Sequence, residues 1–103
     1  WWDNEIIFAQ ARKYLESHDE LNASVYMAVG GMEERQMPEK HWVSNLYKMD
    51  ALLRGKMLSG FRLKTELFPN EGHTGVFGLF HSRGLREVYG PVNCPPFQAG
   101  NCP

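Results

Sequence analysis

The sequence of 103 residues lacks a strong net charge, a cluster of like charges and a long hydrophobic run. Eleven lysine and arginine residues and twelve aspartate and glutamate residues give a formal net charge of −1. Binding to a phosphate backbone needs clustered cations. A membrane-spanning helix needs roughly 20 apolar residues, whereas the longest apolar run covers residues 25–29. We therefore expect no nucleic-acid partner and no membrane span.

Sequence motifs for metals and phosphate-bearing cofactors are also missing. His18, His41 and His81 stand apart, without an HExxH motif or a cysteine pair beside them, so the pattern predicts no zinc site. The pair Gly30 and Gly31 lacks the other glycines of a dinucleotide-binding or Walker motif. We expect no cofactor.

The sequence does contain alternating helical and extended patterns, in a composition (43% hydrophobic, 22% charged) typical of one globular domain. Residues 24–29 are continuously apolar, which is typical of a strand covered on both faces. Residues 61–68 alternate apolar and polar side chains, which indicates a strand with one face in water. The predicted elements, in order, are helix 4–18, strand 24–29, loop 30–37, helix 39–58, strand 61–68, loop 69–75 and helix 76–89.

This helix-strand-helix-strand-helix order predicts an α/β fold in which the two strands are parallel neighbours. In the central helix Trp42, Met49 and Met57 recur at helical spacing, and we expect them in the core rather than in a cofactor site. Two parallel strands make a small sheet for three helices to cover. We therefore expect further strands upstream of Trp1 and, without them, association into an oligomer through the uncovered strand edge.

The loops that follow the two strands hold the candidate functional residues, because the carboxyl ends of parallel strands meet at one edge of a sheet. The first loop contains Glu33 and Glu34, and the second contains His73. An imidazole oriented by a carboxylate takes a proton from a serine hydroxyl and returns it to a leaving group. On spacing alone, solvated loop residues are the simpler interpretation of all three side chains.

Three segments of the sequence carry a family likeness: residues 1–4 (WWDN), 25–33 (VYMAVGGME) and 61–73 (FRLKTELFPNEGH). They resemble the C-terminal part of an esterase family of α/β hydrolases, in the branch that contains siderophore esterases of the ferric-enterobactin type. The segment that ends in Glu-Gly-His is the most specific. The resemblance implies that residues 1–90 are the C-terminal portion of an α/β-hydrolase sheet, followed by a proline- and cysteine-rich tail at 91–103.

The resemblance also implies roles for individual residues. It makes His73 the catalytic base and Glu33 the carboxylate that orients it, with Glu34 as the second choice. Some members of this branch work with a Ser–His dyad and no fixed acid. The resemblance further implies that Trp1 and Trp2 line the substrate cleft, for which buried packing is the alternative.

The nucleophile of such a hydrolase has no counterpart in the sequence, because the Gly-x-Ser-x-Gly elbow is missing. The order along an α/β-hydrolase chain is serine, acid, histidine, so the resemblance implies a serine in a missing N-terminal part, upstream of Trp1. The 103 residues alone are then expected to be inactive. The implied function is hydrolysis of a small-molecule carboxylic ester or a siderophore lactone. The alternative is a non-catalytic, hydrolase-derived binding or interaction module.

The two cysteines, Cys94 and Cys102, enclose Pro95, Pro96 and Gly100 in the tail. Turn residues of this kind can bring two Cα atoms within the distance of about 4.4–6.8 Å that a disulfide requires. We therefore predict a bridge, which favours a periplasmic or secreted location; two free thiols are the alternative. Thiol titration of the unreduced, denatured protein tests the bridge, and two reactive thiols per chain would contradict it.

Overall fold

The computed structural model describes residues 3–90, so the predictions for Trp1, Trp2, Cys94 and Cys102 lie outside the described residues. Within this range, the helices and strands follow one another in the order that the sequence predicts, with additional short helical turns. They are η1 (Asp3–Glu5), α1 (Ile6–Ser17), β1 (Glu20–Gly30), α2 (Glu33–Gln36), η2 (Pro38–Lys40), α3 (Trp42–Lys56), β2 (Ser59–Phe68) and α4 (Val76–Tyr89), where η denotes a 3₁₀-helical turn.

The two strands β1 and β2 form a parallel sheet. The register pairs Ala23 with Phe61 and continues to Gly30 opposite Phe68. Both strands are longer than their apolar patterns indicate, because residues at their amino ends also pair: Glu20 lies opposite Ser59. A register shift separates this pair from the pair of Ala23 and Phe61. The α/β class and the parallel pairing of neighbouring strands are thus confirmed.

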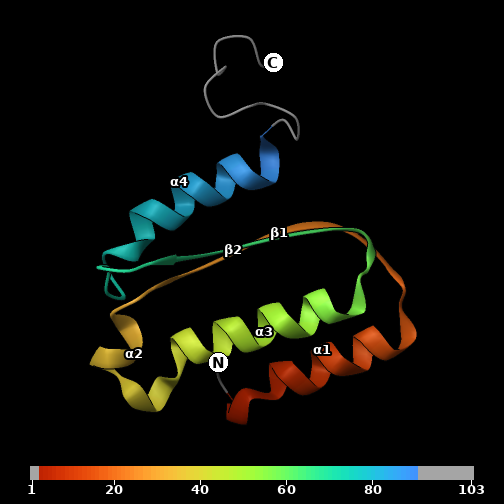
Figure 1. The fold of residues 1–103 in the computed structure, drawn as a ribbon, viewed down its shortest axis with the longest axis horizontal. Coiled ribbons are helices and arrows are strands. Elements are labelled where there is room, and N and C mark those ends of the chain that lie inside the picture. Colours follow the sequence, from red (N-terminus) through yellow and green to blue (C-terminus); the bar gives the residue numbers. More distant parts are fainter. Residues whose placement is uncertain (1–2, 91–103) are drawn as a thin grey trace.

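The sheet lies between two layers of helices (Figure 1). α4 covers one face of the sheet, and α3 covers the other with α1 packed against it. Strand side chains face both helix layers. Thr65 of β2 faces α3 and donates to Asp50 at 2.6 Å, whereas the ring of Tyr26 of β1 faces α4 and packs against Gly84. The buried apolar side chains of the core are Phe8, Leu15, Val29, Leu46, Met49, Leu58 and Val76.

The polar face of β2 points to the same side as α4, which packs mainly on β1. Arg62 Nε donates to Ser24 Oγ at 2.8 Å, and the Tyr26 hydroxyl donates to Glu66 Oε2 at 2.8 Å. Burial, together with the bond to Glu66, raises the pKa of the Tyr26 phenol above its ordinary range. Two polar side chains of β2, Arg62 and Glu66, are therefore bonded to β1, whereas Lys64 between them is exposed to solvent.

Four sequence predictions need correction. Loop 30–37 contains the helical turn α2. Helix 39–58 is split into η2 and α3, because His41 between them adopts a left-handed backbone with φ 52°. Met57, expected in the core, is 88% exposed, because α3 ends before it and its own backbone is left-handed with φ 54°. Trp42, also expected in the core, is only half-buried.

The loops that follow β1 and β2 are tied together through their backbones. Gly31 N–H donates to the Phe68 carbonyl at 2.8 Å, and Met32 N–H donates to the Glu71 carbonyl at 3.0 Å. A Cβ atom at Gly31 would lie 2.8 Å from the Pro69 carbonyl oxygen and 2.9 Å from the Pro69 Cα. Glycine at this position therefore permits the two loops to touch.

Gly31→Ala should destabilise the protein by about 1–3 kcal/mol, because the added methyl group meets backbone atoms that have no rotamer to change. Gly55→Ala, in α3, is the matched control, since a Cβ there has nothing within 4 Å, and it should stabilise by about 0.5–1 kcal/mol. Chemical denaturation of the protein measures both effects. Equal stability of the two variants would contradict the packing role of Gly31.

Candidate functional site

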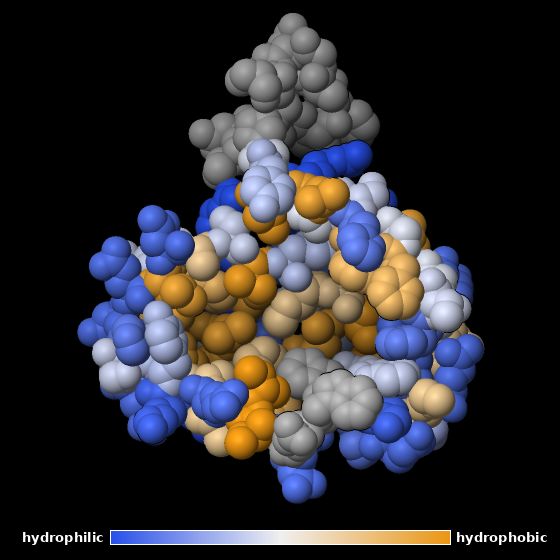
Figure 2. Space-filling model, turned by 180° about the vertical axis from the view of Figure 1, so that it is seen from behind, coloured by the Kyte–Doolittle hydropathy of each residue, from blue (hydrophilic) through white to orange (hydrophobic). Residues whose placement is uncertain are grey.

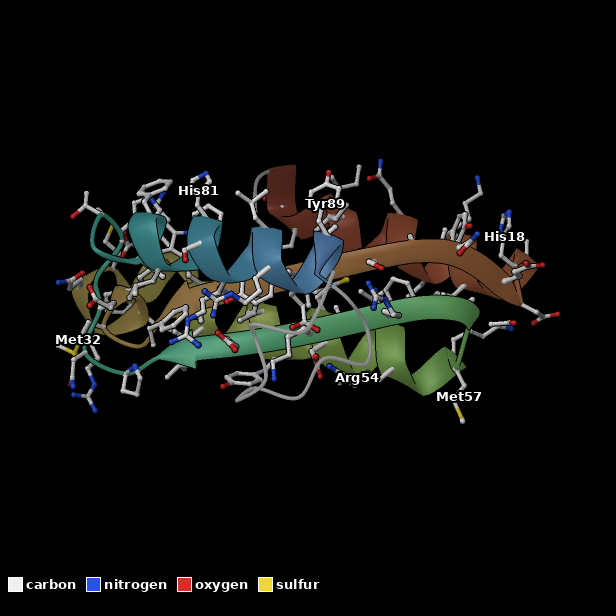
Figure 3. The ribbon with its side chains drawn as sticks, turned by 90° about the horizontal axis from the view of Figure 1, so that it is seen from above. His18, Met32, Arg54, Met57, His81 and Tyr89 are labelled. Atoms are coloured by element: carbon white, nitrogen blue, oxygen red, sulfur yellow. The ribbon has the colours of Figure 1, made fainter. Side chains whose placement is uncertain are left out.

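An acid–base pair lies at the carboxyl ends of the two strands. Glu33, on α2 just after β1, and His73, in the loop after β2, place Oε2 and Nδ1 2.8 Å apart. In Figure 3, Met32, the neighbour of Glu33, lies at one end of the sheet, and His18 and Met57 lie at the other. Parallel pairing of β1 with β2 thus brings together two residues that are 40 positions apart.

The Glu33 carboxylate is almost completely buried: its side chain is 5% exposed, compared with 55% for His73. Oε1 accepts the Gly30 N–H at 2.8 Å, and Oε2 contacts His73. Such partners are required because an unpaired buried charge is strongly unfavourable. An ionised carboxylate only accepts hydrogen bonds, so opposite an ionised Glu33 a neutral His73 ring carries its proton on Nδ1 and has its lone pair on Nε2. The buried residue fixes the tautomer, and the exposed residue offers a proton-accepting nitrogen.

Aromatic side chains surround the His73 ring. Trp42, at the start of α3, stacks on it with ring centroids 4.5 Å apart and planes at 9°. Phe77 of α4 meets it edge-on at 5.9 Å and 69°. A pocket of about 170 Å³ opens beside the ring. The other side chains that line this pocket are apolar: Ala28, Val29, Leu46, Val76 and Phe80, besides Glu33.

Glu34, the second candidate acid, has a different role. Its carboxylate accepts the Ser44 N–H at 2.7 Å and the Ser44 hydroxyl at 2.5 Å. Ser44 lies in the first turn of α3, where backbone N–H groups lack helical partners, and His41 at the N-cap position makes no side-chain cap. Glu34 therefore caps α3, and the hydrogen bonds from Ser44 lower the pKa of the Glu34 carboxyl. The geometry joins Glu33, not Glu34, to His73.

The described serines do not complete a nucleophile–base pair with His73. Ser17 contacts His18, Ser24 accepts from Arg62, and Ser44 binds Glu34. Within residues 3–90, the hydrogen bond of His73 goes to Glu33 and none goes to a serine. The same part of the chain contains no cluster of three potential metal-ligating side chains.

Two residues of the site were not identified from the sequence. Trp42 has the helical spacing of a core residue, and only its position at the start of a helix beside the strand ends could have marked it as a neighbour of His73. Gly30 contributes a backbone N–H to Glu33, a role for which glycine leaves no sequence signal. The two tryptophans expected to line the cleft, Trp1 and Trp2, lie outside the described residues.

Comparisons of the chain with protein-family models, with curated proteins and with solved structures return no match. Among the helices of residues 3–90, none has both the length and the apolar character needed to cross a membrane. The chemistry of the site must therefore be inferred from its geometry.

Glu34→Ala should lower the free energy of unfolding by about 1 kcal/mol at neutral pH, the typical contribution of a side-chain helix cap. The pKa of Glu34 is lower in the folded protein than its ordinary value of 4.5, so the unfolded chain takes up a proton first as the pH falls below 4.5. The difference between wild type and variant should therefore be fully present above this pH and shrink below it. Chemical denaturation from neutral pH down to about pH 3 measures this trend.

Glu39→Ala is the control, because Glu39 is an exposed carboxylate on the neighbouring turn η2. It should change the stability by less than about 0.5 kcal/mol. A loss in Glu34→Ala that does not depend on pH would contradict the capping role of the carboxylate.

Proposed function

We propose that this chain carries the acid–base pair of a serine ester hydrolase of the α/β-hydrolase superfamily. The proposal depends on one observation: the buried Glu33 carboxylate holds Nδ1 of the half-exposed His73 at 2.8 Å, at the carboxyl ends of neighbouring parallel strands. A carboxylate–imidazole pair in which the carboxylate is buried and the imidazole is exposed is the arrangement that activates a serine hydroxyl. The family resemblance of the sequence points to the same chemistry.

In the proposed reaction, Nε2 of His73 takes the proton of a serine hydroxyl while the serine oxygen attacks the ester carbonyl. Glu33 keeps the ring in the Nδ1–H tautomer and stabilises the imidazolium that forms. The imidazolium then gives its proton to the leaving alcohol, and an acyl-enzyme remains. Nε2 next activates the water molecule that hydrolyses the acyl-enzyme. The scheme needs neither a cofactor nor a metal.

The serine is proposed to lie upstream of Trp1, on a preceding strand of the same sheet. The free edge of β1 supports this placement, because within residues 3–90 β1 pairs with β2 on one side only. Seen from behind, the molecule has an apolar hollow between the helix layers (Figure 2). β1 and α4 line pockets of about 170 and 280 Å³ along this edge. Further strands would cover the edge and bring another strand end close to His73.

The pocket beside His73 supports a compact substrate. Its volume of about 170 Å³ and its apolar lining suit a small uncharged group next to the proton-accepting nitrogen. We therefore propose a small-molecule carboxylic ester, and the family resemblance adds siderophore lactones as a candidate class.

A second candidate function is a non-catalytic module that binds a partner through the edge of β1. The observation that favours it is the exposure of large apolar side chains on α4, the helix beside this edge: Phe77, Leu85 and Tyr89. Exposed apolar patches next to an unpaired strand edge commonly mark interaction sites. In this case the acid–base pair would only stabilise the strand ends.

His73→Ala should lower kcat/KM of the full-length gene product for a p-nitrophenyl ester by at least about 10⁴-fold, as loss of the base does in serine hydrolases. Glu33→Gln should cost less than loss of the base, up to about 10⁴-fold, because the amide fills the same space but donates to Nδ1 and so reverses the tautomer. The controls are Glu39→Gln, at an exposed carboxyl on η2, and His18→Gln, at the opposite end of the sheet. Both controls should keep the activity.

A serine-directed phosphonate should label the full-length protein in the same experiment and leave residues 1–103 unlabelled. Unchanged turnover in His73→Ala would refute the assignment of the base. A full-length protein that neither turns over esters nor reacts with the phosphonate would favour the binding module instead.

A further inference from the structure

We propose that Trp42 is a positioning residue that sets the plane of the His73 ring and thereby aims Nε2, an inference that rests on the proposed ester hydrolysis. Trp42 lies on α3, whereas the carboxylate partner of His73 lies on α2. The nearly parallel stack, with centroids 4.5 Å apart and planes at 9°, is the observation that carries the proposal.

A hydrogen bond at one nitrogen does not fix an imidazole completely. The contact between Nδ1 and Glu33 Oε2 holds one corner of the ring, and the ring plane can still turn about the line that joins these two atoms. His73 lies in a loop and its side chain is 55% exposed, so neither regular structure nor burial prevents this rotation. A broad aromatic face parallel to the ring does prevent it, and the Nε2 lone pair then keeps one direction.

The start of α3 is itself held in place by hydrogen bonds, so the Trp42 ring has a fixed position against His73. Glu34 bonds Ser44, two residues after Trp42, through both the backbone N–H and the hydroxyl. Glu33, the neighbour of Glu34, meanwhile bonds the ring. One helical turn, α2, therefore fixes both the edge of the imidazole and the helix end that carries the indole.

The same stack favours the charge that His73 gains during the reaction. A cation over the face of an indole is attracted by the electrons of the ring, and the imidazolium forms directly against Trp42. Of the elements packed around His73, α2 supplies the charged group Glu33, while α3 and α4 supply Trp42 and Phe77. The indole thus acts on the orientation and on the charge of His73.

Trp42→Leu in the full-length protein should lower kcat by about 10- to 100-fold, the cost of a misplaced catalytic group, with KM changed by less than about threefold. Trp42→Phe, which keeps an aromatic face, should restore most of kcat. The control is Tyr47→Leu, an exposed aromatic residue of the same helix, and it should leave kcat unchanged. Far-UV circular dichroism and thermal unfolding compare the folding of all variants.

Fluorescence tests the stack without any need for activity. An imidazolium stacked on an indole quenches its emission, so acidification that protonates His73 should quench the part of the emission that comes from Trp42, which is identified as the part missing in Trp42→Phe. This quenching should disappear in His73→Gln and persist in His81→Gln, because His81 lies against Phe77 and Phe80 instead.

The two measurements separate the inference from the proposed function. Quenching that survives in His73→Gln, or a Trp42→Leu variant with unchanged kcat, would overturn the positioning role. An equal loss of kcat in Trp42→Phe and Trp42→Leu would also overturn it, because the aromatic face would then be irrelevant. If the quenching depends on His73 but the full-length protein does not turn over esters, the result would support the stack of Trp42 on His73 and refute only the hydrolase proposal.

Discussion

Backbone contact between the loop after β1 and the loop after β2 sets the geometry of the candidate site. The contact is possible because residues 30 and 31 are glycines: a side chain at Gly30 would collide with the Glu71 carbonyl, and one at Gly31 with Pro69. Two hydrogen bonds from the first loop to the second then hold the loops together. Glu33 and His73 approach each other because the backbones of nearby residues in the two loops, Met32 and Glu71, are already in contact.

The two neighbouring glutamates of the helical turn α2 have identical side chains but different roles. Successive residues of a helix point about 100° apart, since a turn contains 3.6 residues. Glu33 therefore points into the sheet edge, where it is buried between Gly30 and His73. Glu34 points to α3, where it stays partly exposed and satisfies the helix end. Their chemical difference comes from burial and partners alone.

The sequence could predict the order of the main elements, the parallel pairing and the edge of the sheet at which the candidate site lies. These features follow from the continuous apolar pattern of 24–29, the alternation of 61–68 and the rule for strand ends. Spacing alone could not choose between Glu33 and Glu34, and only the family resemblance favoured Glu33, because that choice depends on the phase of α2, a helix too short to show periodicity. Helical spacing also placed Met57 in the core, but Met57 follows the end of α3 with a left-handed backbone and is exposed.

Strand register links the fold directly to the chemistry. Parallel strands lack the tight turn that fixes the register of a hairpin, and a slip of one residue would shift β2 along β1 by about 3.3 Å. Since the atoms of Glu33 and His73 are 2.8 Å apart, such a slip would separate them and would also turn the apolar side chains of β2 towards the wrong layer. A mispaired sheet would therefore lose its core and its acid–base pair in the same step, so the interactions that keep β1 and β2 in register also preserve the site.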